Sequence, residues 1–131
     1  MAFHFELVSP DRLILSGQVN QVTLPGYEGD FTVLEGHTAL IALLRPGIVD
    51  VDTGTGVRRH FVRSGLADVS TKGLIVLAEH AIPFEELSAD QITTEIQRAD
   101  EEIEAAVDPG SKRLASEKRD RLRELRVALK I

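Results

Sequence analysis

The side chains that could bind a metal or act in catalysis are not found at the spacings that such sites require. No histidine belongs to an H-x-x-x-H or H-E-x-x-H pattern, which would place two metal ligands on one helix face; the four are His4, His37, His60 and His80. No serine lies in a G-x-S-x-G context. The chain has no cysteine, so it has no thiolate nucleophile and no cysteine-based zinc site. The sequence therefore predicts no metal centre and no catalytic residue.

Phosphate-binding patterns are also missing. No G-x-x-x-x-G-K-[ST] string occurs, and Arg59 stands where a G-x-G-x-x-G pattern begun by Gly54 and Gly56 needs its third glycine. Asp50 and Asp52 lie one strand period apart on one face, which is more typical of a solvated face than of an acid/base pair. A small hydrolase built on strands stays an alternative only if Ser, His and Asp converge in three dimensions.

Composition excludes several further classes of protein. The 131 residues carry a net charge of −6, with 43% hydrophobic and 27% charged residues, enough to form a core. The acidic balance and the lack of tryptophan disfavour nucleic-acid binding. The longest apolar run, 39–44, is far shorter than the roughly 20 residues of a membrane span. The N-terminus shows no signal or transit peptide, so we expect the protein in the cytosol of a bacterium.

The first part of the chain has the pattern of a β-sandwich. Residues 1–84 hold 9 of the 10 glycines and 4 of the 5 prolines, which separate short apolar runs. A glycine at 17 separates two of these runs, and the run 38–44 is apolar enough to be buried on both faces. The predicted strands are 3–8, 12–16, 19–24, 31–34, 38–44, 47–51, 57–62, 66–69 and 74–78. With no helix between them, they predict an antiparallel β-sandwich or flattened barrel.

Residues 85–131 have the pattern of two helices. Ser88 and Gln91 form a capping box, and apolar residues follow at helical spacing, at Ile92, Ile96, Ala99 and Ile103. Pro109-Gly110 ends this helix, and a second stripe follows at Leu114, Leu122, Leu125 and Leu129. Residues 85–108 carry a net charge of −8 and residues 109–131 one of +5. This opposition predicts an antiparallel, separable hairpin and so an α+β protein with domains 1–84 and 85–131.

The stretch 25–47 is the unusual part of the first domain. Glycines at 26, 29 and 36 permit tight turns, and Glu28 and Asp30 form an acidic tip between them. The stretch is either a polar loop joining strands or a rigid acidic loop that docks a partner.

This stretch resembles the epsilon subunit of the bacterial F-type ATP synthase. In that family an acidic loop leads to Gly-x-Phe/Leu, a hydrophobic strand, a histidine and a Leu-rich strand ending in Pro-Gly. The matching residues are Gly29, Phe31, His37, Leu40, Pro46 and Gly47. The block 64–79 and Leu125-Arg126-Val127 also match, so the resemblance covers essentially the whole chain.

The resemblance implies a non-catalytic rotor subunit in the central stalk of a proton-translocating, ATP-synthesising complex, without a cofactor. It implies gamma and the c-ring as partners, and a peripheral place at the cytoplasmic face of the bacterial inner membrane, held there through the complex. The implied interface residues are Glu28, Gly29, Asp30, Phe31 and His37.

The resemblance also implies a regulatory role for the hairpin. In the family the hairpin folds against the sandwich or extends along gamma toward the alpha and beta catalytic subunits, and in many bacteria the extended form blocks ATP hydrolysis. The implied inhibitory contacts come from the basic second helix, at Arg119, Arg121, Arg123 and Arg126. The alternative is that these charges only neutralise the first helix.

Some family members bind ATP in the folded hairpin through an I/L-D-x-x-R-A motif. Here 94–99 reads Thr-Glu-Ile-Gln-Arg-Ala, so Thr94 and Glu95 depart from the motif while Arg98 and Ala99 match it. Glu95 and Arg98 would be the ATP contacts, and the alternative function is a free-standing regulatory module that senses ATP. We expect Arg98 instead to form an ion pair with a neighbouring carboxylate.

Overall fold

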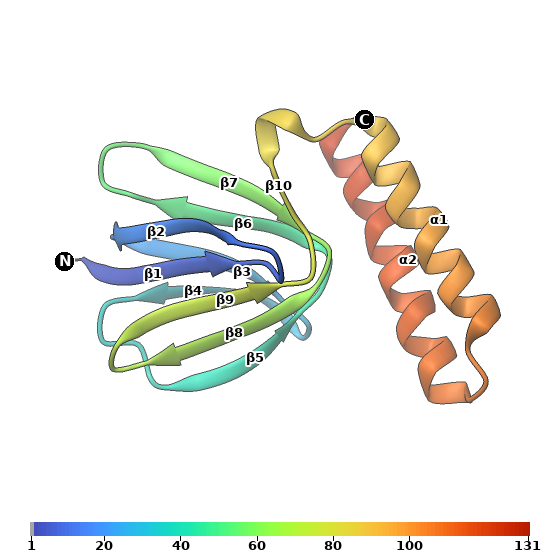
Figure 1. Ribbon diagram of the computed structural model, residues 1–131, viewed down its shortest axis with the longest axis horizontal. Coiled ribbons are helices and arrows are strands. Elements are labelled where there is room, and N and C mark those ends of the chain that lie inside the picture. The colour runs from blue at the N-terminus through green and yellow to red at the C-terminus, as the bar shows by residue number, and fades with distance from the viewer. Residues whose placement is uncertain (1) are drawn as a thin grey trace. The chain divides into compact units, whose positions relative to one another are not determined.

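The computed structural model describes residues 2–131, and the chain divides into two compact units, Met1–Glu85 and Glu86–Ile131. The first unit is built from strands and the second from two helices (Figure 1). Within the described residues, neither helix is both long and apolar enough to cross a membrane.

The strands of the first unit form one curled sheet. Its order is β10-β7-β6-β3-β5-β8-β9-β1-β2, with β4 paired to β3. The curl brings the two ends of the sheet face to face as a sandwich, so the predicted fold class is confirmed. The strands are β1 (Phe3–Val8), β2 (Leu13–Val19), β3 (Gln21–Gly26), β4 (Gly29–Leu34), β5 (Leu40–Leu44), β6 (Gly47–Asp52), β7 (Val57–Val62), β8 (Gly65–Ser70), β9 (Gly73–Ala78) and β10 (Ala81–Pro83).

The core of this unit follows from the period-two alternation of its strands. Phe5 and Leu7 of β1 face inward with Val49 and Val51 of β6, and all four are fully buried. Every buried member of this core cluster lies between Phe5 and Ala78. The strand unit therefore has a hydrophobic core of its own.

The structure corrects four details of the strand prediction. Gly17 lies inside β2, and the break falls at Asn20, whose N–H donates to the Asp52 carbonyl at 2.7 Å. The run 38–44 is not buried on both faces, because Ile41 and Leu43 are 68% and 64% exposed. β10 was not predicted. One ladder, β1 with β9, is parallel whereas the others are antiparallel.

Gly73 gives the first testable prediction. Its φ of +123° is rarely adopted by residues with a side chain, and a Cβ there would meet the backbone carbonyl oxygen of His4 on the neighbouring strand. We expect Gly73→Ala to lower the free energy of unfolding by about 1–3 kcal/mol, measured by chemical denaturation. Gly56→Ala is the matched control, because a Cβ at Gly56 would meet nothing within 4 Å. Equal stability of the two variants would contradict this account.

The second unit consists of α1 (Ala89–Ala105) and α2 (Pro109–Leu129). The predicted capping box is confirmed: Gln91 N–H donates to Ser88 Oγ, and Ser88 N–H donates to Gln91 Oε1. Pro109 does not end α1, however; it is the first residue of α2. Proline suits this position because the first helical N–H needs no partner within the helix.

Asp108 caps α2, so the turn between the helices is set by a side chain. Its Oδ1 accepts the Ser111 N–H at 2.8 Å and its Oδ2 accepts the Ser111 hydroxyl at 2.9 Å. These two hydrogen bonds lower the pKa of Asp108 from its ordinary value, and the bond from the Ser111 backbone has the larger effect. In the helix seam Ala115 is buried, whereas Leu114 of the predicted stripe is 48% exposed. The predicted stripe is therefore wrong at Leu114.

Candidate functional site

The acidic tip is a tight two-residue turn between β3 and β4. Gly26 and Gly29 are paired across it, and a Cβ on Gly26 would meet the Gly29 carbonyl oxygen and the Phe31 ring. The Tyr27 N–H donates to the Leu43 carbonyl at 2.8 Å, which ties the turn to β5. The turn is thus fixed by backbone contacts, as a docking element requires.

The two acidic side chains of this tip differ in their surroundings. Asp30 Oδ1 accepts from Arg45 Nη2 at 3.4 Å, so this carboxylate has a partner within the unit. Glu28 is exposed, and among the ion pairs described for residues 2–131 none involves it. Glu28 therefore offers the free charge of the tip.

A hollow of about 450 Å³ lies between this turn and β5. Most of its lining is apolar, with Glu28 as its one charged residue. The lining residues are Gly26, Tyr27, Glu28, Gly29, Phe31, Leu40, Ile41, Ala42 and Leu43. Three of the predicted interface residues, Glu28, Gly29 and Phe31, thus line one cavity.

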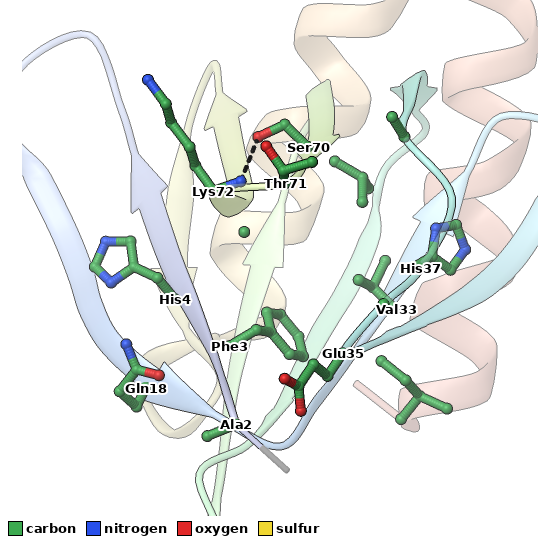
Figure 2. A pocket seen from close by; sticks show the side chains of 15 residues that line it. Ala2, Phe3, His4, Gln18, Val33, Glu35, His37, Ser70, Thr71 and Lys72 are labelled. Carbon is green, nitrogen blue, oxygen red and sulfur yellow. Dashed lines mark hydrogen bonds between the residues drawn. The ribbon is translucent and has the colours of Figure 1, made fainter.

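His37 lies beyond the other end of β4, in a second hollow of about 560 Å³ (Figure 2). Phe3 and Val33 supply apolar lining, and the polar side chains around them include His4, Glu35 and Lys72. His37 Nδ1 donates to the Thr38 carbonyl at 2.7 Å. The six residues of β4 span about 20 Å, so the structure does not bring His37 together with Glu28.

Sequence reasoning missed an apolar row on the outer face of the sheet. Register places Leu43 beside Leu66, Leu66 beside Leu77, Leu77 beside Val8, and Val8 beside Leu13. The three whose side chains are most exposed are Leu43, Leu77 and Leu13. The signal was present in the sequence, because β5 and β9 carry apolar residues at outward as well as inward positions. We call Leu43, Leu66, Leu77, Val8 and Leu13 the outer row.

A contiguous apolar row on the surface of a strand unit is typical of a protein-binding surface, because a contact there removes apolar area from water. The neighbouring row is mixed, with Ile41, Asp68, Ile75 and Glu6 in register across the same sheet. An apolar centre beside a partly charged flank is the usual composition of a protein interface.

The basic helix divides into paired and exposed arginines. Arg119 Nη1 lies 3.6 Å from Asp100 Oδ1, and Lys118 Nζ lies 3.6 Å from Glu102 Oε2, so both bases neutralise α1. Arg121 Nη1 lies 3.7 Å from Glu124 Oε2. Arg123 and Arg126 are exposed, and no ion pair is described for either within residues 2–131. Of the four predicted inhibitory arginines, these two are the ones open to a partner.

Arg98 forms the expected ion pair. Its Nη1 donates to Glu95 Oε1 at 3.0 Å, one helical turn away. The Glu95 side chain is buried, whereas the Arg98 side chain is about half exposed. A buried carboxylate is costly without a cationic partner, so this pair is part of the hairpin's own packing.

The remaining candidate groups do not converge on a reaction centre. Asp50 Oδ2 accepts from Arg59 Nε at 3.2 Å, and Asp52 Oδ1 accepts the Gly54 N–H at 2.9 Å. Over residues 2–131, no three His, Asp or Glu side chains are grouped so that they could hold a metal ion. Asp50 thus belongs to a solvated face of the sheet, and Asp52 stabilises a turn.

Known proteins match both parts of the chain. The family model "ATP synthase, Delta/Epsilon chain, beta-sandwich domain" matches residues 2–84. The ATP synthase epsilon chain of Parvibaculum lavamentivorans is 44% identical over 124 residues, covering 94% of each chain. The ATP synthase epsilon chain of Bradyrhizobium sp. strain ORS 278 is 50% identical over 94 residues, covering 72% of this chain and 70% of its own.

A solved structure shares the fold. A chain in the Euglena gracilis mitochondrial ATP synthase (OSCP, F1 and c-ring in rotational state 1) superposes with a TM-score of 0.74 at 24% identity, covering 98% of this chain and 81% of that one. The family model and the curated relatives give the identity. The chain therefore belongs to the ATP synthase epsilon-chain family, as a structural and not a catalytic subunit of that complex.

Proposed function

We propose that the protein is a rotor subunit in the central stalk of a proton-translocating F-type ATP synthase, where it links gamma to the c-ring at the cytoplasmic face of a bacterial inner membrane. The observation that carries the proposal is the outer row, a row of apolar residues across five strands on the surface of a unit that has its own core. Transfer of torque needs a stiff body that binds two partners at different places. A packed sandwich with separate surfaces meets this need.

The two partners differ in the surface that each would contact. The outer row supplies apolar area and fits gamma, which must stay bound through many rotations. The acidic turn supplies polar groups and fits the loops of the c-ring, with Glu28, Gly29, Asp30 and Phe31 as contacts. His37 lies at the other end of β4 and would reach gamma or the c-ring only through a separate contact. Charge at such a contact sets register and specificity more than affinity.

A pull-down tests this proposal. The full-length chain with an affinity tag is isolated from detergent-solubilised membranes of cells that express it. We expect gamma and the c-ring subunit to elute with it in constant ratio through a salt wash. Elution of the chain without either subunit would overturn the proposal.

We also propose that the hairpin inhibits ATP hydrolysis by binding the alpha and beta catalytic subunits. The support is the exposed pair Arg123 and Arg126, whose charges α1 does not neutralise. Arg119 and Arg121 would first have to leave their ion pairs within the hairpin. Their contribution to such a contact is therefore smaller.

Sensing of ATP by a free-standing module is the second candidate, and the Arg98–Glu95 pair disfavours it. A phosphate group would have to take Arg98 from Glu95 and leave a buried carboxylate without this partner. We expect isothermal titration of ATP into the full-length chain to show no sub-millimolar binding. Stoichiometric sub-millimolar binding that is lost in Arg98→Ala would favour the sensor instead.

A further inference from the structure

The hollow at the His37 end of β4 is bounded by four segments, and two of them are turns held by their own hydrogen bonds. The segments are the start of β1, the end of β2, the turn after β4 and the turn between β8 and β9. In the turn after β4, Gly36 has a φ of +79° and the His37 N–H donates to the Leu34 carbonyl at 3.1 Å. In the other turn, the Lys72 N–H donates to Ser70 Oγ at 3.2 Å. A cavity of about 560 Å³ with such fixed walls has the size of a small-molecule site.

The turn after β4 brings two hydrogen-bond acceptors to the cavity. Glu35 is exposed, and none of the ion pairs described for residues 2–131 includes it. Because His37 Nδ1 donates to the Thr38 carbonyl, Nε2 of the neutral ring carries the lone pair. A carboxylate and an imidazole acceptor on one turn favour a ligand that is positively charged and rich in N–H groups.

The interior of the hollow is apolar and includes an aromatic ring. Phe3 and Val33 line it, and in Figure 2 the Glu35 carboxylate lies beside the Phe3 ring. The face of an aromatic ring attracts a cation, and its apolar body packs against an aliphatic chain. Among the described lining residues, Lys72 is the one with a permanent positive charge, and Figure 2 shows its amine directed away from Phe3 and Glu35. No ammonium group of the chain therefore stands between the ring and the carboxylate.

We propose that this hollow binds a small organic cation, with an ammonium or guanidinium group on a short aliphatic chain. The cationic group lies against Glu35 and donates to His37 Nε2, and the aliphatic chain packs on Phe3 and Val33. A metal ion fits poorly, because no three His, Asp or Glu side chains of residues 2–131 are grouped to hold one. An anion fits poorly too, because it would face the Glu35 carboxylate. The site lies at the other end of β4 from the acidic turn, so the inference is independent of the proposed function.

Titration of the full-length chain with agmatine, followed by amide chemical shifts in NMR spectra, tests the site. Agmatine carries a guanidinium and an ammonium group on one aliphatic chain, and hexanoate is the probe of opposite charge. We expect agmatine to bind with a Kd below about 1 mM and to shift the amides of Gly36, His37 and Gly73. Hexanoate should cause no saturable shift of these amides, because its carboxylate would be repelled by Glu35.

Two matched variants distinguish this site from a general attraction of cations to an acidic protein. Glu35→Gln keeps the size of the side chain and removes its charge, so it should raise the Kd for agmatine about tenfold. Asp11→Asn removes an exposed carboxylate that does not line the hollow, and it should leave the Kd unchanged. The proposal is overturned if agmatine gives no saturable shifts around the hollow, if Glu35→Gln binds it as tightly as the unsubstituted chain, or if both variants weaken binding equally.

Discussion

Removing residues 86–131 is expected to raise the rate of ATP hydrolysis by the assembled complex. If the hairpin favours its blocking position by about 1 kcal/mol, only about one complex in six is active at any time, so its removal gives about a sixfold increase. Assembly should be kept, because the core of the strand unit lies entirely between Phe5 and Ala78. The measurement is ATPase activity of purified complexes, matched for their content of the truncated and full-length chains.

Variants that replace two arginines by neutral residues distinguish the loss of an inhibitory contact from the loss of the whole hairpin. Arg123→Gln with Arg126→Gln should reproduce part of the activation, because these side chains are exposed and not paired to α1. Lys112→Gln with Arg113→Gln, at the start of the same helix, serves as the control of equal charge change. Unchanged hydrolysis in the truncated complex would mean that the hairpin does not inhibit hydrolysis.

A charge in the outer row is expected to release the subunit from gamma. Leu77→Asp places a carboxylate at the middle of the row, beside Leu66 and Val8 in register. A charge buried against an apolar partner should cost about 2 kcal/mol of binding free energy, which raises the Kd roughly thirtyfold. The measurement is the affinity of the full-length chain for purified gamma, by calorimetry or surface binding.

Val57→Asp is the matched control for this substitution. Val57 is 53% exposed and Leu77 is 47% exposed, so both changes put a carboxylate on the surface of the same unit. Val57 lies on β7, at a distance of several strands from the outer row in the sheet order. Equal affinities of the two variants for gamma would contradict the proposal that gamma binds the outer row.

The helices were well predicted where their signals are local. The capping box at Ser88 depends on residues three apart, and the opposite charges of the two helices act between neighbours across a short turn. The prediction was wrong at Pro109, because proline is compatible with the first turn of a helix as well as with the end of one. Asp108 decided between these, since its side chain caps the helix that follows.

The strands show where local patterns are insufficient. Strand boundaries came close because turn residues mark them, yet β5 was expected to be buried on both faces. A strand with apolar residues at both alternating positions has the same sequence pattern whether both of its faces are buried or one of them is exposed to solvent. Ile41 and Leu43 are exposed to solvent, which only the three-dimensional arrangement reveals.

Residue type, short-range spacing and charge are enough to predict the family, the two-part fold and the acidic turn. Which residues lie close together depends on the three-dimensional arrangement of the strands. It placed Glu28 and His37 at opposite ends of β4, and it aligned the outer row from five strands that are scattered along the chain. The physical reason is that strand register joins residues far apart in sequence, through backbone hydrogen bonds that no short pattern records.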